Sequence, residues 1–180
     1  MVIVTKLYDK YALINDKEGN TVYSQGWFGK HTKSGYIKLN PYETVLLLER
    51  KKIDIPDKKE TSLPLSEVVA HFSNNIPDFL VRFLLYKDLR NRGYVVKEHV
   101  ENGNYFELYE RGATPNQAKH LALVVTMAEG VLFDIDEIDL IVSQAKEISK
   151  QLIFAVIDSL GDVSYYSVSE LEFTKLDING

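Results

Sequence analysis

Short runs of apolar and β-branched residues alternate with turn residues over the first forty positions of the chain. This pattern is typical of short strands joined by tight turns. The segment Asp-Lys-Glu-Gly-Asn at 16–20 has turn composition, so we expect a turn there. A small antiparallel or mixed sheet follows from this pattern, with strands over residues 2–7, 11–14, 21–24 and 36–39.

The pattern then changes to helical spacing. Asn40 suits an N-cap, Pro41 the first helical position and Glu43 the third residue of a capping box, which predicts a helix to about Lys52. A short helix is expected after Ser66. Polar residues and a proline at 73–77 interrupt the pattern, and we predict a domain boundary there, between residues 1–76 and 77–180.

The second part reads as helix, hairpin, strand, helix and further strands. Asn-Gly within 101–104, between two β-rich runs, is a strong hairpin signal. The expected fold is α+β or mixed α/β: a small N-terminal mixed-sheet domain and a C-terminal domain with a helix-flanked mixed sheet of four or five strands. Helices are expected over 78–92 and 134–150, and strands over 94–100, 105–109, 121–127, 152–158, 163–168 and 172–175.

Composition narrows the possible chemistry. The 180 residues include no cysteine, which excludes a thiol nucleophile, a disulfide framework and thiolate metal sites. No apolar run approaches the roughly 20 residues of a membrane span, so we expect a cytoplasmic protein with no membrane partner. The net charge of −5 argues against a protein that coats nucleic acid. That charge is uneven, because residues 1–76 carry 11 basic and 9 acidic side chains and residues 77–180 carry 10 and 17.

Without cysteine, histidine, tyrosine, lysine and the carboxylates remain as general acids and bases. Of the four histidines, His71 is expected to be packed, His31 to lie in a loop and His99 to face solvent beside a hairpin. His120 differs because it closes a polar loop and opens a buried strand, where a rigid element can hold a catalytic group.

Several ordered segments then point to one family. They are Phe-Leu-Leu-Tyr-Lys-Asp-Leu-Arg-Asn-Arg-Gly-Tyr-Val-Val-Lys at 83–97, Phe-Glu-Leu-Tyr-Glu-Arg-Gly at 106–112, Pro115 with His120, Lys-Gln-Leu-Ile-Phe-Ala-Val-Ile-Asp at 150–158 and Gly-Asp-Val-Ser-Tyr-Tyr at 161–166. In order and spacing, residues 80–168 resemble the archaeal tRNA-splicing (tRNA-intron) endonucleases. The first 75 residues fit the amino-terminal domain of that family in size and position.

The resemblance implies a nuclease that cuts precursor tRNA at bulge-helix-bulge junctions without metal or cofactor, leaving 2′,3′-cyclic phosphate and 5′-hydroxyl ends. It assigns Tyr109 as base for the 2′-hydroxyl, His120 as acid for the departing 5′ oxygen and Lys150 as electrostatic stabiliser. An unperturbed phenol titrates near 10, so a nearby cation such as Lys150 would have to favour the phenolate. Individually, Tyr109 would also suit an alternating strand and Lys150 a helix C-terminus.

Two positions depart from the family pattern: Leu121 stands where a serine is usual, and Ser143 where some members have a base-gripping arginine. Lys146 shares a helical face with Ser143 and could partly substitute for it, or a partner subunit could supply the clamp. Arg111 and Lys119 are further candidates for RNA contact. So are five basic residues that would equally well form a solvated face, namely Arg82, Lys87, Arg90, Arg92 and Lys97.

Assembly is also implied by the resemblance, because members of the family work as four catalytic-domain units. This chain would form a homo-oligomer or a heterotetramer with a structural subunit, and an acidic turn containing Asp158 and Asp162 would dock into a basic cleft. An ordinary hairpin turn explains the same residues. Two alternatives to an active subunit are a non-catalytic structural subunit and a metal-dependent nuclease. The second lacks support, since no Asp…Glu-x-Lys arrangement occurs on adjacent core strands.

Overall fold

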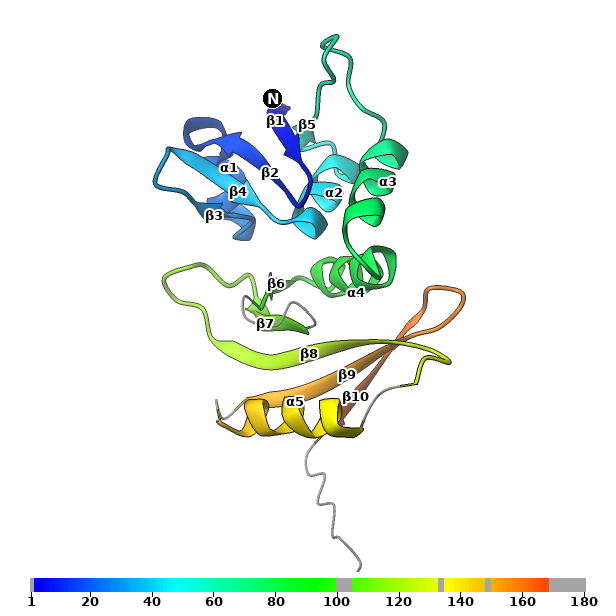
Figure 1. The fold of residues 1–180 in the computed structure, drawn as a ribbon. Coiled ribbons are helices and arrows are strands. Elements are labelled where there is room, and N and C mark those ends of the chain that lie inside the picture. Colours follow the sequence, from blue (N-terminus) through cyan, green and yellow to red (C-terminus); the bar gives the residue numbers. More distant parts are fainter. Residues whose placement is uncertain (1, 100–104, 133–134, 148–149, 169–180) are drawn as a thin grey trace, which may run out of the picture.

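In the computed structural model, which describes residues 2–99, 105–132, 135–147 and 150–168, two five-stranded sheets are stacked with helices between and beside them (Figure 1). The prediction of a mixed α/β fold is confirmed. The predicted turn at 101–104 and the predicted strand over 172–175 lie outside the described residues.

The N-terminal sheet has the strand order β3-β4-β2-β1-β5. Its neighbours pair antiparallel except β1 and β5, which are parallel, so the sheet is mixed as expected. Two of its strands are only two residues long, and the sequence pattern did not indicate them. The strands are β1 (Ile3–Tyr8), β2 (Tyr11–Asn15), β3 (Lys30–His31), β4 (Tyr36–Leu39) and β5 (Ile53–Asp54).

Residues predicted as a turn and a strand, 16–24, belong instead to one helix, α1 (Asp16–Gly26), so both predictions are wrong. The Asn15 side chain caps this helix by accepting a hydrogen bond from the backbone N–H of Lys17. Gly19, the apparent turn glycine, lies inside the helix, where an added Cβ would come within 2.9 Å of Ile37 and 3.0 Å of Ile14. Glycine is therefore needed for close packing on the sheet.

Three further helices lead from the first sheet to the second. The predicted capping box is present in α2 (Pro41–Glu49), where Asn40 and Glu43 bond each other's backbone N–H groups. The helix ends three residues before the predicted Lys52. It is followed by α3 (Leu65–Asn75) and α4 (Phe79–Asn91).

The C-terminal sheet has the order β10-β9-β8-β7-β6, and its five strands agree with the predicted number. All neighbouring strands are antiparallel except β8 and β9, which are parallel and are connected through α5 (Ile135–Glu147). The strands are β6 (Tyr94–Glu98), β7 (Tyr105–Arg111), β8 (His120–Ala128), β9 (Gln151–Ile157) and β10 (Val163–Val168).

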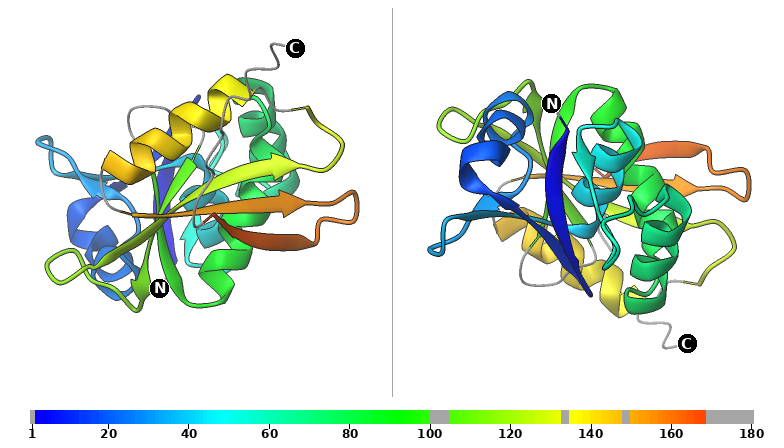
Figure 2. Two further views of the ribbon diagram at one scale, coloured as in Figure 1. Left: turned by 90° about the horizontal axis from the view of Figure 1, so that it is seen from below. Right: turned by 90° about the horizontal axis from the view of Figure 1, so that it is seen from above.

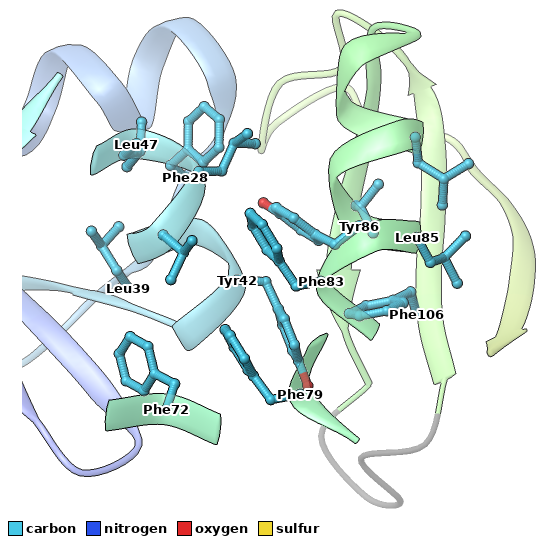
Figure 3. Close-up of a cluster of buried hydrophobic side chains, with 14 of the residues drawn as sticks. Phe28, Leu39, Tyr42, Leu47, Phe72, Phe79, Phe83, Leu85, Tyr86 and Phe106 are labelled. Carbon is cyan, nitrogen blue, oxygen red and sulfur yellow. The ribbon is translucent and has the colours of Figure 1, made fainter. Parts of the chain in front are cut away.

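The two faces of this sheet are covered unequally. One face packs on α4, while α5 lies on the other (Figures 1 and 2). The α4 side belongs to a large aromatic core in which Tyr42 stacks on Phe79 at 5.4 Å and meets Phe106 edge-on at 5.3 Å between ring centroids (Figure 3). Since Tyr42 precedes the expected boundary at 76/77 and Phe79 and Phe106 follow it, one hydrophobic core spans both halves.

No helix in the described part of the chain has the length and apolar character needed to cross a membrane.

Candidate active site

The three predicted catalytic residues come together at one end of the C-terminal sheet. Tyr109 on β7 lies opposite His120, the first residue of β8, and their ring centroids are 5.2 Å apart. The β7–β8 pairing shifts register between Leu108 and Tyr109, which re-aims the side chains that follow. Two residues eleven positions apart therefore become cross-strand neighbours.

Lys150 directly precedes β9. Its backbone N–H donates a hydrogen bond to the carbonyl of Ala145 on α5 at 3.0 Å. Because Gln151 pairs with Ala122 in the parallel ladder, Lys150 lies level with the beginning of β8. Its positive charge is one cause that lowers the pKa of His120. Within the described residues, no hydrogen bond or ion pair occupies the Lys150 ammonium, which leaves this cation available for a phosphate.

The phenol of Tyr109 is held by a carboxylate. Tyr109 Oη donates to Glu107 Oε2 at 2.7 Å, and the other oxygen, Oε1, lies 2.8 Å from His99 Nδ1, which must carry the hydrogen because a carboxylate only accepts. Burial, this hydrogen bond and the charge of Glu107 all raise the pKa of Tyr109. The expectation that Lys150 favours the phenolate is therefore wrong: the phenol is neutral in this arrangement.

The His120 ring is held by a backbone carbonyl. Its Nε2 lies 3.0 Å from the carbonyl of Ala122, so Nε2 is the donor and Nδ1 is left for a ligand. Burial is the main cause that lowers the pKa of His120 below its usual 6.5, and the charges of Lys150 and His99 act in the same direction. The Ala122 hydrogen bond and the charge of Glu107 oppose this shift. His120 is thus poised to give up a proton readily when protonated.

An aromatic residue of the N-terminal half completes the surroundings of Tyr109. Trp27 is the C-cap residue that follows α1, and its backbone is left-handed with φ of 49°. The centroid of its ring lies 4.9 Å from that of Tyr109. Lys97 Nζ lies 5.4 Å from the Trp27 ring and bonds Glu43 Oε1 at 2.9 Å. Backbone conformations that cost energy often mark functional sites.

Two residues at this site, Trp27 and Glu107, were missed from the sequence, and so was the contact between His99 and Glu107. His99 was expected to face solvent, and it is instead partly buried against Glu107. The signal for Glu107 was its position two residues before Tyr109 on the same strand. For Trp27 the signal was only that it is the single tryptophan of the chain.

The predicted RNA-contacting residues are all exposed near this end of the sheet. Arg111 ends β7 with its guanidinium 4.9 Å from the Tyr94 ring, Lys119 closes the loop before His120, and Lys146 lies in the last turn of α5. Ser143 is exposed on the same helix. Their contact with RNA stays a prediction.

The five other basic residues are mostly engaged within the fold. Lys87 pairs with Glu49, Arg92 with Asp88 and Lys97 with Glu43 at 2.6, 2.6 and 2.9 Å. Arg90 is buried, and Arg82 lies against two aromatic rings. These contacts favour a structural role over phosphate binding.

The acidic turn between β9 and β10 is internally bonded. Asp158 Oδ1 accepts from the backbone N–H groups of Leu160 and Asp162 at 2.8 and 2.9 Å, and Gly161 supplies the positive φ of 87°. The Asp162 side chain and Leu160 are exposed. Asp158 therefore shapes the turn, and docking by this turn stays a prediction.

No group of three His, Asp or Glu side chains is placed to hold a metal ion in the residues that the structure describes.

Residues 79–165 match the family of the tRNA intron endonuclease catalytic C-terminal domain, and residues 4–69 match that of the tRNA intron endonuclease N-terminal domain. A tRNA-splicing endonuclease of Methanococcus vannielii is 32% identical over 172 residues, which cover 94% of this chain and 95% of that protein. The chain belongs to the tRNA-splicing endonuclease family.

Other family members differ in length. The tRNA-splicing endonuclease of Thermococcus kodakarensis is 33% identical over 154 residues, covering 86% of this chain and 89% of its own. That of Methanococcoides burtonii is 28% identical over 156 residues, which are 87% of this chain but 43% of the longer relative. The resemblance predicted from the sequence is confirmed, and the range that matches the catalytic domain contains Tyr109, His120 and Lys150.

Proposed function

We propose that the chain is a catalytic subunit that cleaves precursor tRNA at bulge-helix-bulge exon-intron junctions. Cleavage is a transesterification by the neighbouring 2′-hydroxyl, needs no metal or cofactor and leaves 2′,3′-cyclic phosphate and 5′-hydroxyl ends. The observation that carries this proposal is the assembly of Tyr109, His120 and the unpaired Lys150 at one end of the sheet. A purely structural subunit has no need of this trio.

Each residue has one task in this reaction. The 2′-hydroxyl gives its proton toward Tyr109 as its oxygen attacks the adjacent phosphorus, and the bond from phosphorus to the 5′ oxygen breaks. Protonated His120 gives a proton to that 5′ oxygen through the nitrogen not bonded to Ala122. The Lys150 ammonium stabilises the charge that grows on the phosphate oxygens.

The substrate side of the proposal uses the exposed cations around the site. Bulged nucleotides present unstacked bases and 2′-hydroxyls that a protein can contact. We expect the exposed side chains of Arg111, Lys119 and Lys146 to contact the flanking phosphates. The working assembly is a homo-oligomer or a heterotetramer with a structural subunit, in which Asp158 and Asp162 belong to a docking turn.

The decisive test is cleavage of a bulge-helix-bulge RNA by the purified chain in EDTA, with the product ends identified. Cyclic phosphate and 5′-hydroxyl ends support the proposal, and cleavage that requires a divalent ion contradicts it. No cleavage by the chain alone, followed by cleavage after addition of a second subunit, identifies subunit dependence. No cleavage under either condition favours the non-catalytic structural subunit.

The His120→Ala variant tests the acid. We expect cleavage to fall about 10²–10⁴-fold, the usual contribution of general acid–base catalysis, with RNA binding nearly unchanged. His71→Ala is the matched control, because His71 lies on α3 and contacts the carbonyl of Tyr8 in the N-terminal half. Cleavage that survives in His120→Ala would show that the acid is another group.

A further inference from the structure

The carboxylate of Glu107 bridges two side chains at the site, and no step above uses it. One oxygen accepts the hydroxyl of Tyr109 at 2.7 Å and the other accepts Nδ1–H of His99 at 2.8 Å. Tyr109 lies on β7, the strand that also carries Glu107, and His99 is the residue that directly follows β6. The Glu107 side chain is therefore fixed at both carboxylate oxygens.

We propose that Glu107 is a positioning residue for Tyr109 that takes the phenol proton during cleavage. The proton of the 2′-hydroxyl moves to Tyr109 Oη while the hydrogen already on Oη moves to Glu107 Oε2. The 2′ oxygen then forms its bond to phosphorus, the 5′ oxygen leaves with a proton from His120, and the tyrosine ends neutral as it began. This inference rests on the proposed function, since it concerns the proton that leaves the ribose.

The charges around Glu107 support this role. Lys97 is its cross-strand partner in the β6–β7 ladder, yet the Lys97 ammonium is bonded to Glu43 and to the carbonyl of Gly29. The negative charge of Glu107 raises the pKa of His120 on β8, and the positive charge of Lys150 lowers it. Among the described residues, the only charged or titratable partners bonded to the Glu107 carboxylate are therefore Tyr109 and His99, so no permanent cation is paired with it.

This arrangement also answers a chemical difficulty. A neutral phenol with a raised pKa is a poor base by itself, because few molecules carry the phenolate near neutral pH. A carboxylate behind the phenol removes the need for a free phenolate. The protein then needs only a carboxyl group, which in general ionises several pH units below a phenol.

The Glu107→Gln variant separates this role from a structural one, because its two effects have opposite signs. Replacing the carboxylate by a neutral amide removes the negative charge that opposes ionisation of the Tyr109 phenol, and we expect the pKa of Tyr109 to fall by about one unit or more. If phenolate alone were the base, cleavage would become faster. The proposal predicts that single-turnover cleavage slows by about 10- to 100-fold, because the amide cannot take the proton.

Two readouts are needed. The Tyr109 pKa is followed by carbon NMR of tyrosine labelled at Cζ, with the signal assigned by its absence in Tyr109→Phe. The cleavage rate is measured as a function of pH. In Glu107→Gln we expect the rising limb of the pH–rate profile to move to higher pH. Glu107→Asp keeps a carboxylate, so we expect it to recover part of the cleavage rate and the wild-type position of the rising limb. Glu110→Gln, the same charge change at an exposed residue of β7, is the control and stays within about twofold.

The outcomes are distinct from those of the proposed function. Glu107→Gln that cleaves as fast as wild type or faster, or with an unmoved pH profile, overturns the role of Glu107 while leaving the endonuclease intact. Wild-type protein that cleaves no RNA, either alone or after addition of a second subunit, overturns the proposed function. The NMR titration still decides whether Glu107 controls the Tyr109 proton, and an unchanged phenol pKa in the variant overturns the proposal whatever the activity.

Discussion

Two tyrosines of the C-terminal sheet, Tyr109 and Tyr165, donate their hydroxyl to a carboxylate. Tyr109 donates to Glu107 at 2.7 Å, and Tyr165 on β10 donates to Asp88 of α4 at 2.5 Å. In both pairs burial and the carboxylate raise the pKa of the phenol. A raised phenol pKa alone does not distinguish a site from a structural contact.

The two pairs differ in what accompanies the carboxylate. Asp88 also accepts from Arg92 Nε at 2.6 Å, so a permanent cation offsets its charge. Glu107 is accompanied instead by His99, with His120 nearby, and neither of these is a permanent cation. The Tyr165 pair therefore fastens α4 to β10, whereas the Tyr109 pair keeps the ability to exchange protons.

The largest expected difference between the pairs is in catalysis. Tyr109→Phe removes the oxygen that receives the ribose proton, and cleavage should fall by about 100-fold or more. Tyr165→Phe removes the same hydrogen bond to a carboxylate from the other pair, and cleavage should stay within about twofold. Single-turnover cleavage of a bulge-helix-bulge RNA measures both. Equal losses in the two variants would abolish the distinction.

The cations of the two regions should also behave differently. Lys150→Met removes the unpaired ammonium, and we expect a loss of about 10²–10³-fold in cleavage, as for other groups that stabilise transition-state charge. Arg92→Met removes a cation that contacts Asp88 and Tyr165, away from the Tyr109 pair, so the rate should be retained. A Lys150→Met enzyme of normal rate would contradict the role of Lys150.

Solution pH should affect only the Tyr109 region between pH 6 and 8. His120 must be protonated to act as the acid, and its pKa is lowered from 6.5, so the falling limb of activity lies below that value. The rate should decrease about tenfold per pH unit above it. Arg92 remains charged throughout, so the Tyr165 pair contributes equally across this range. A falling limb above pH 7 would contradict the shift of His120.

The smallest expected effect is on stability. Asp88→Asn loses the ion pair with Arg92 and weakens the bond to Tyr165, which should lower the free energy of unfolding by about 1 kcal/mol, since these groups are partly exposed. Urea denaturation measures this change. Cleavage by Asp88→Asn should match wild type, the reverse of Glu107→Gln, and a catalytic defect without loss of stability would be inconsistent with a fastening role.

The family resemblance assigns Tyr109, His120 and Lys150 to one site, and their approach in the fold could be expected because all three lie at the ends of predicted elements. Tyr109, His120 and Lys150 each adjoin a β-rich run, and those runs were apparent from their apolar residues. The protonation of Tyr109 was predicted in the wrong direction, because it depends on whether Lys150 or Glu107 reaches the hydroxyl. The order and spacing of the strands do not determine which of these two side chains contacts the Tyr109 hydroxyl.

Contacts between distant segments account for the other errors. Gly19 is a residue typical of turns, but in the fold it lies inside α1 and packs against Ile14 and Ile37. Trp27 belongs to the half that carried little motif information, and its contact with Tyr109 joins that half to the C-terminal sheet. Local patterns predict elements well, but they do not report which elements meet.

Trp27 also gives this protein an internal optical reporter. Because the chain has one tryptophan and its ring lies 4.9 Å from that of Tyr109, light absorbed selectively by indole is emitted from the catalytic end of the sheet. The fluorescence of the unlabelled protein should therefore respond when a nucleotide enters beside Tyr109, and it should be far less sensitive to changes in the β9–β10 turn. Occupancy of the site can thus be followed in real time without attaching a dye.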